Sequence, residues 1–193
     1  MKKIAVIIFV LFSVILNAEK ITITFPPPAL VGTPQPIKID PKNIDNSSAP
    51  RELDLPAGTQ NLARNKAVSA SDDLIIVGEL NYITDGDKDG DEGYEVELAP
   101  GLQWVQIDLE KSAQIYAIAL WHYHRQKRVY HDVIIQCSDD ATFQKNVTTI
   151  FNNDFDNSAN LGRGNDKVYI ETHLGKIIVP AKSVPAARYW RFY

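Results

Sequence analysis

The stretch Val105-Gln106-Ile107-Asp108-Leu109, preceded by Trp104, alternates apolar and polar side chains at every residue. Successive side chains of a β-strand point to opposite faces of its sheet, so this run predicts a strand with one buried and one polar face. Val133–Cys137 is apolar except for Gln136 and predicts a strand that is buried on both faces. These two runs favour β-structure over helix in the middle of the chain.

Similar short runs recur through the later part of the chain, separated by Gly, Asn and Asp and without helical spacing. They are Ile115–Tyr123, Val147–Phe151, Val168–Glu171, Lys176–Val179 and Tyr189–Phe192. Strands at this spacing, with no helices between them, predict an all-β fold in which the sheets are antiparallel and form a sandwich.

Three segments differ in composition. Residues 1–18 combine Lys2 and Lys3 with an apolar run and end on the small residue Ala18, as a secretory signal peptide does. The apolar run is shorter than the roughly 20 residues of a membrane span, so no stable span is expected. Residues 19–60 contain eight of the 11 prolines and are interpreted as a linker, although 21–25 alternates like a strand. Residues 61–193 form the predicted domain.

Charge and cysteine content narrow the possible functions. The formal net charge of the 193 residues is -4, which provides no basic surface for nucleic acid. The single cysteine, Cys137, lies within an apolar run and is interpreted as a buried residue, so the fold is expected to form without a disulfide. The leader predicts a secreted, periplasmic or cell-surface protein.

The acidic run Asp85-Gly86-Asp87-Lys88-Asp89-Gly90-Asp91-Glu92 suggests a calcium loop. Alternate aspartates offer the oxygen ligands that calcium prefers, and a glycine at the sixth place permits the turn. Val96 stands at the twelfth place, where an EF-hand has Glu, and no flanking helices are predicted, so an EF-hand is not expected. The alternative is a solvated polar turn.

The run Trp121-His122-Tyr123-His124-Arg125 is the second candidate site. In a strand, His122 and His124 would face the same side and could share a metal, but the basic residues of 126–128 disfavour a cation. A polar strand end without a ligand is favoured over the metal site. Aromatic faces, imidazoles and guanidinium donors also suit a sugar, and that interpretation fits the composition best.

Catalysis has little support in the sequence. There is no Gly-x-Ser-x-Gly motif, and the only cysteine lies in a predicted strand. The Gly-rich piece 161–165 does not connect a strand to a helix and is therefore no phosphate loop. The chain is predicted not to be an enzyme.

Several motifs together resemble the discoidin domain, also called the coagulation-factor type C domain, of the galactose-binding-like fold. They occur in order over residues 61–193: Asn61–Ser71, Ile83–Asp87, Trp104–Leu109, Tyr130–Val133 with Ser138–Asp140, and Ala187–Tyr193. The chain is most similar to discoidin domains of secreted bacterial proteins with the Trp-His-Tyr-His run. The resemblance implies a jelly-roll sandwich that binds ligands, often glycans, through loops at one end.

The resemblance also implies a structural calcium (Ca2+) at the acidic loop. Asp85 is the best candidate ligand, Asp87 the next, and the main-chain carbonyl of Leu80 a third. Members of the family are usually non-catalytic.

The family normally continues beyond the final run, Arg188–Tyr193, into one more strand. We therefore expect the jelly roll to lack its last strand, with an unpaired edge beside Tyr189–Phe192. Either the sequence is a fragment of a longer protein, or the position of the missing strand is occupied by Ile21–Phe25 or by a second chain.

These observations predict a secreted module that recognises a glycan or cell-surface polysaccharide. The residues expected to bind the ligand are His122, Tyr123, His124, Arg125 and Arg163. The alternative is a protein adhesion or assembly module of the cell envelope, with another protein as its partner.

Overall fold

A computed structural model describes residues 17–30 and 40–193. The predicted signal peptide lies outside the described residues except for Asn17 and Ala18. Within these ranges the only helices are two short 3-10 turns, η1 (Pro41–Asn43) and η2 (Leu80–Ile83). No helix of the described residues is long and apolar enough to cross a bilayer.

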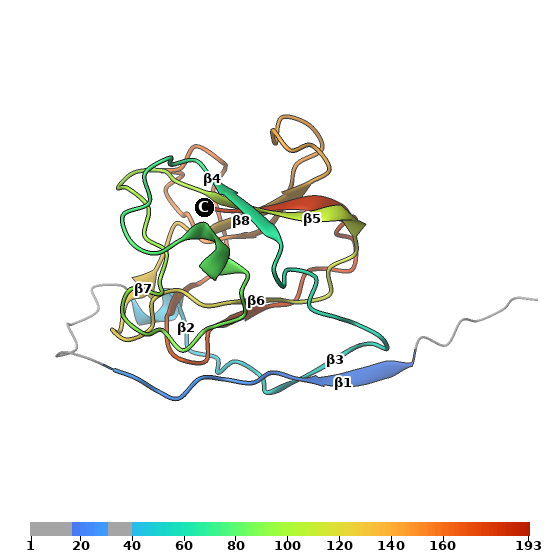
Figure 1. Cartoon of the computed structure of the whole chain (residues 1–193), viewed down its shortest axis with the longest axis horizontal. Coiled ribbons are helices and arrows are strands. Elements are labelled where there is room, and N and C mark those ends of the chain that lie inside the picture. Colours follow the sequence, from blue (N-terminus) through green and yellow to red (C-terminus); the bar gives the residue numbers. More distant parts are fainter. Residues whose placement is uncertain (1–16, 31–39) are drawn as a thin grey trace, which may run out of the picture.

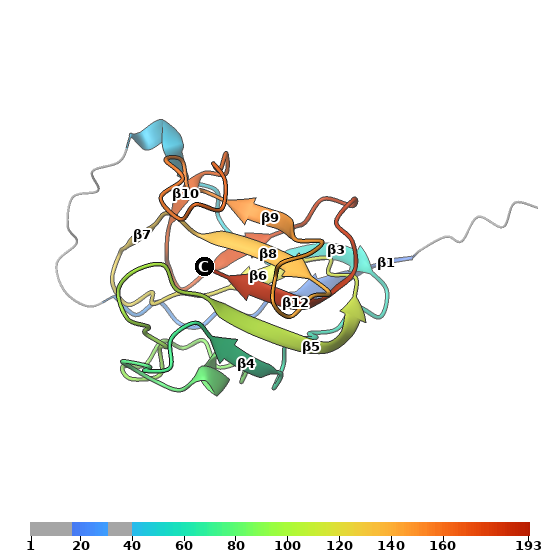
Figure 2. The same cartoon turned by 90° about the horizontal axis from the view of Figure 1, so that it is seen from above.

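The larger layer is a five-stranded antiparallel sheet, seen at the top of Figure 1 and from above in Figure 2. Its strands, in order across the sheet, are β4 (Ala67–Ala70), β5 (Val105–Ala113), β12 (Ala187–Phe192), β8 (Ile134–Ser138) and β9 (Thr148–Asn152). β12 lies between β5 and β8, which come from the middle of the chain, whereas β8 and β9 are consecutive strands. The sheet therefore joins the beginning, middle and end of the predicted domain.

Two smaller sheets face it (Figure 1). One pairs β6 (Ile118–Leu120) with β11 (Lys176–Ile178), and the other has the order β2 (Ile44–Asp45), β10 (Val168–Ile170) and β7 (Val129–Tyr130). All pairs are antiparallel except β2 with β10. The all-β sandwich with antiparallel sheets that the sequence predicts is confirmed.

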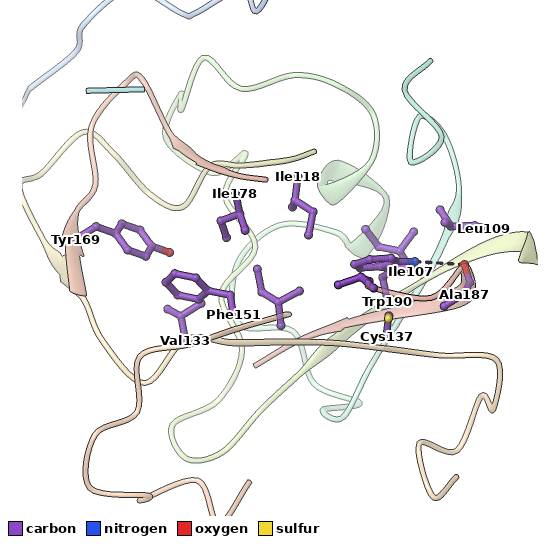
Figure 3. Close-up of a cluster of buried hydrophobic side chains, with 12 residues drawn as sticks. Ile107, Leu109, Ile118, Val133, Cys137, Phe151, Tyr169, Ile178, Ala187 and Trp190 are labelled. Atoms are coloured by element: carbon purple, nitrogen blue, oxygen red, sulfur yellow. Dashed lines mark hydrogen bonds between the residues drawn. The ribbon is translucent and has the colours of Figure 1, made fainter. Parts of the chain in front are cut away.

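The core lies between these layers (Figure 3). Alternation brings Ile107 of β5 and Trp190 of β12 inward from the large sheet, while Ile118, Tyr169 and Ile178 come from the opposite side. Cys137 is fully buried, and burial, followed by the charge of Asp139, raises the pKa of its thiol to about 11. The thiol is therefore protonated at neutral pH and packs as a small apolar group.

The outer face of the large sheet holds a buried cation. The guanidinium of Arg191 lies between the rings of Trp104 and Phe143, 4.0 and 4.1 Å from their centroids. Its Nε and Nη2 donate to Oε1 of Gln106 at 3.0 and 2.6 Å. Ring faces and an amide oxygen thus replace the water that the charge loses on burial.

The expected unpaired edge beside Tyr189–Phe192 is wrong. Strand β12 pairs with β5 on one side and with β8 on the other over Tyr189–Phe192, so it lies in the interior of the sheet. Segment Ile21–Phe25 does not add to this sheet either, because β1 (Ala18–Thr22) pairs with β3 (Glu52–Pro56). The outer strands are β4 and β9.

The segment 19–60, interpreted as a linker, contains ordered elements. Strands β1 and β3 form a two-stranded ribbon below the smaller sheets (Figure 1), and β2 adds to β10. Ile44 and Leu55 are buried, which the proline content of the segment did not suggest. Asp45 also forms an ion pair with Lys176 of β11. The division of the chain into leader, linker and domain stays a prediction.

The Asp45–Lys176 pair predicts a pH-dependent contribution to stability. Burial acts to raise the pKa of Asp45, but hydrogen bonds from Lys176 and Ser47 outweigh it and lower the pKa from 3.8 to about 2. Because the pKa is depressed in the folded state, the stabilisation is complete above pH 3.8 and is lost as the pH falls through about 2. Asp45→Asn should lower the free energy of unfolding by about 1–3 kcal/mol at pH 7.

Urea unfolding of both proteins at pH 7 and near pH 2 measures this difference, which should shrink at the acid pH. Glu52→Gln is the control, since it removes the exposed Lys20–Glu52 pair and should cost about 0.5 kcal/mol or less. A D45N chain as stable as the unmodified one at pH 7 would show that the pair does not hold β2 in place.

Candidate functional site

The candidate site is the connection 121–128 between β6 and β7. The sequence predicts one strand over Ile115–Tyr123, but β6 spans only Ile118–Leu120. Its partner β11 begins at Lys176, directly after a turn that Gly175 closes with a positive φ of 65°. A Cβ at Gly175 would lie 2.6 Å from the ring of Trp121. The chain beyond Leu120 therefore has no strand partner and forms an irregular loop.

His122 is held by a buried carboxylate. Oε2 of Glu171 accepts the main-chain N–H of His122 at 3.1 Å and lies 3.0 Å from its Nδ1. Oε1 accepts the N–H of Thr172 at 3.1 Å, and the Glu171 side chain is fully buried. An ionised carboxylate only accepts hydrogen bonds, so this geometry places the proton of a neutral imidazole on Nδ1 and the lone pair on Nε2.

Aromatic packing fixes the plane of the same imidazole. The rings of His122 and Tyr130 are stacked with centroids 4.1 Å apart, and Tyr130 lies beside Tyr169 across the β7–β10 pair. Burial, with the charge of Glu171, raises the pKa of Tyr130 to about 12 and also raises that of Tyr169. Both phenols are therefore neutral at physiological pH. With 25% of its side chain exposed, His122 presents one edge of a fixed ring to solvent.

Tyr123 and Arg125 lie on the same loop. The guanidinium of Arg128 lies 4.8 Å from the ring centroid of Tyr123, and Tyr130 donates its hydroxyl to the carbonyl of Tyr123 at 3.4 Å. Nη1 of Arg125 binds Asp91 at 3.3 Å, which links this loop to the acidic loop. Both side chains are partly exposed. They can offer an aromatic face and charged donors next to His122.

His124 occupies a different environment from His122. It is 2% exposed, its Nε2 donates to the carbonyl of Lys88 at 2.9 Å, and its Nδ1 is buried without a partner. A Cβ on Gly90 would lie 2.8 Å from the imidazole, so the acidic loop covers the ring closely. The common face expected for His122 and His124 requires a regular strand, and residues 121–124 do not form one.

Arg163 lies apart from the other predicted ligand residues. It belongs to the loop between β9 and β10 and lines a shallow pocket beside Asn152 of β9. Within the described residues, no hydrogen bond, ion pair or cation–π contact joins Arg163 to residues 122–125. His122, Tyr123 and Arg125 are thus partly exposed on one loop, whereas His124 lies beneath the acidic loop.

The acidic loop fits calcium only in part. Leu80 begins η2, and Asp85 follows the residue that caps it. One carboxylate oxygen of Asp85 accepts the N–H of Asp87 at 2.8 Å, and one of Asp87 accepts that of Asp89 at 2.9 Å. The guanidinium of Arg64 packs so closely on Gly86 that a Cβ there would overlap it. Two carboxylates remain able to bind a cation, but a fixed positive charge lies among them.

A different loop pair gathers three carboxylates. Asp132, Asp154 and Asp156 place one oxygen each within 4.8 Å of one another. Asp154 is fully buried and accepts the N–H groups of Ser158 and Ala159 at 3.1 and 3.0 Å. Burial acts to raise its pKa, but these hydrogen bonds hold the pKa below its ordinary value. Sequence spacing does not reveal this group, because 22 positions separate Asp132 from Asp154.

Three residues that shape the site, Tyr130, Tyr169 and Glu171, were not among the predicted ligand residues. Tyr169 and Glu171 lie in the predicted strand Val168–Glu171, and an acidic residue at the end of an otherwise apolar strand was the available signal. The imidazole that the Glu171 carboxylate contacts, that of His122, lies 49 positions away in the sequence. Only the pairing of β10 with β7 brings the two together.

Comparisons with known proteins give structural similarities alone. No family model matches the chain, and no curated protein matches it. One similar solved structure is chitosan-binding module 1 of a chitosanase/glucanase from Paenibacillus sp. IK-5, at 22% identity and a TM-score of 0.41, covering 69% of this chain and 85% of that one. Another is CpGH89CBM32-4 of Clostridium perfringens in complex with GlcNAc-α-1,4-galactose, at 20% identity and a TM-score of 0.42, covering 70% and 79%. Likenesses this distant carry no argument about the ligand of this chain.

Calcium at Leu80, Asp85 and Asp87 stays a prediction that thermal unfolding can test. An ion bound only by the folded state raises the melting temperature by mass action, so added calcium should stabilise the chelator-treated protein. Asp85→Ala should abolish that difference. Asp156→Asn is the matched comparison, because it removes a carboxylate of the other acidic group.

Two outcomes would contradict the prediction. Equal melting temperatures with calcium and with chelator would mean that the acidic loop is a solvated turn. A calcium effect that survives D85A and disappears in D156N would place the ion at the three-aspartate group instead.

Proposed function

We propose that this chain is a secreted, non-catalytic module that recognises carbohydrate through the loop 121–128 at one end of the sandwich. The observation that carries the proposal is the imidazole of His122, which Glu171 and Tyr130 fix in orientation and which remains partly exposed. A ring whose orientation is set before binding loses little conformational entropy when it meets a ligand hydroxyl.

The neighbouring groups suit a sugar. A pyranose presents C–H groups on its faces and hydroxyls around its rim, so it is bound by aromatic rings together with planar hydrogen-bonding groups. Tyr123 provides a ring, His122 an oriented imidazole, and Arg125 and Arg128 guanidinium donors on the same loop. An affinity near 1 mM, about -4 kcal/mol, is what a few such contacts provide.

The His122–Glu171 pair could also belong to a catalytic triad, in which a carboxylate orients the histidine that activates a nucleophile. Among the described residues, no Ser, Thr or Cys side chain hydrogen-bonds to His122. Cys137 lies in the core as a thiol of raised pKa. The arrangement therefore favours binding over nucleophilic catalysis.

A protein adhesion or assembly module of the cell envelope is the second candidate function. It is favoured by large apolar side chains on the long connection between β4 and β5, where Leu74 is 79% exposed and Ile76 and Tyr94 are more than half exposed. Apolar groups that face water in this way suit a protein partner better than a sugar. If the chain binds a soluble glycan and Leu74→Ser leaves that binding unchanged, this candidate function would be disfavoured.

The proposal predicts that His122→Ala removes glycan binding. A glycan array identifies the ligand, and calorimetry then compares the variants, with a loss in affinity of about tenfold or more expected for H122A. His131→Ala is the matched control, because His131 is more exposed, pairs with Asp132 and is not part of the loop. No millimolar binding to any glycan, or equal binding by both variants, would refute the proposal.

Glu171→Gln tests whether Glu171 is a positioning residue. Glutamine can donate through its nitrogen, so the amide no longer forces the proton onto Nδ1. We expect weaker binding in the same calorimetry, together with a change in the NMR signals that report the tautomer of His122. A variant that is merely less stable would keep the tautomer, which separates the positioning role from a purely structural one.

A further inference from the structure

A second hollow lies on the molecule, between the N-terminal segment and the turn that connects β10 to β11. After β1, residues 22–28 run past this turn, and together with Arg51 they line a pocket against His173 and Leu174. One wall is thus contributed by the segment interpreted as a linker, and the other by the sandwich. The pocket exists only because the two are packed together.

Both walls are held in place by hydrogen bonds. In the turn, Gly175 N–H donates to the carbonyl of Thr172 at 2.9 Å, and Trp121 Nε1 donates to the carbonyl of His173 at 3.0 Å. On the opposite wall, the N–H of Ile23 donates to the carbonyl of Arg51 at 2.9 Å, which extends the β1–β3 pairing by one step. The shape of the pocket is therefore set by hydrogen bonds to main-chain carbonyls.

The charge of the pocket is opposite to that of the chain. Its lining contains Arg51 and His173 but no carboxylate, whereas the formal net charge of the protein is -4. Within the described residues, the guanidinium of Arg51 forms no hydrogen bond or ion pair, while the neighbouring Lys20 is paired with Glu52. An exposed, unpaired guanidinium is suited to bind a planar carboxylate through two parallel hydrogen bonds.

The remaining lining groups fit a sugar ring. Phe25, Pro26 and Leu174 provide an apolar surface for the C–H face of a pyranose. Thr22 and Thr24 alternate with Ile23, which lies opposite Arg51 in the extended β1–β3 pairing, so their side chains lie on the other face of the segment and are not part of the proposed contact. A carboxylate and an apolar C–H face on one small ring are features of a uronic acid.

We propose that this pocket binds a uronic acid residue, with its carboxylate on Arg51 and its ring against Phe25. The site is separate from His122, and it extends the proposed function from glycans in general to acidic polysaccharides. Its proposed contacts include neither the side chain of His122 nor a metal. Its success or failure can therefore be measured independently of the first site.

The experiment is calorimetry on the full chain carrying His122→Ala, with the galacturonic acid trimer and the neutral galactose trimer as probes. The acidic trimer is expected to bind with a Kd of about 1 mM, and the neutral trimer at least about tenfold more weakly. Arg51→Gln should weaken the affinity for the acidic trimer about tenfold or more. Arg51→Lys should weaken it less, because lysine keeps the positive charge but lacks the planar guanidinium that forms two parallel hydrogen bonds.

Lys182→Gln is the control, since it removes an exposed positive charge that lines neither pocket and should leave the binding unchanged. Melting temperatures of all variants confirm that the chains are folded. The proposal would be overturned if the two trimers bound equally, if inorganic phosphate bound as tightly as the acidic trimer, or if no probe showed saturable binding. Acidic binding that persists in the H122A chain but not in the R51Q chain would support it even if the His122 site proved to bind nothing.

Discussion

Strand β12 is bound by main-chain hydrogen bonds to β5 on one side and to β8 on the other. Because its neighbours come from the middle of the chain, the sheet closes only when the last residues have been placed. Trp190 then enters the core from this strand, while Arg191 fills the outer face between Trp104 and Phe143. This one strand therefore contributes to the packing on both faces of the sheet.

Short apolar and alternating runs predicted the strands, because each strand has to bury one or both of its faces. Val133–Cys137 and Lys176–Val179, for example, correspond to β8 and β11 within one residue. Alternation could not predict which strands become neighbours, so β12 was expected beside an edge. It also could not predict that β6 ends at Leu120, since that depends on the turn at Gly175, which precedes the distant partner strand β11. Local pattern therefore determined the elements, and tertiary pairing determined their ends and neighbours.

In the candidate site, too, the sequence predicted the residue types but not their tertiary contacts. Residue types alone drew attention to His122 and His124, yet the two histidines differ in what surrounds them. His122 is joined to a buried carboxylate 49 positions away and keeps an exposed edge. His124 is covered by the acidic loop, with its Nε2 bonded to a main-chain carbonyl of that loop. Their roles depend on contacts between distant loops, which a single sequence does not contain.

Trp121 connects the two proposed sites. Its side chain is bonded to the carbonyl of His173 in the wall of the N-terminal pocket, and the following residue is His122. Any movement of the turn 172–175 would therefore act on both sites, because Glu171 directly precedes that turn and binds His122. A ligand long enough to contact both would be an oligosaccharide, and linked contacts of this kind raise a weak affinity by making the second contact intramolecular. The N-terminal segment would then contribute to the affinity of the module as well as to its attachment.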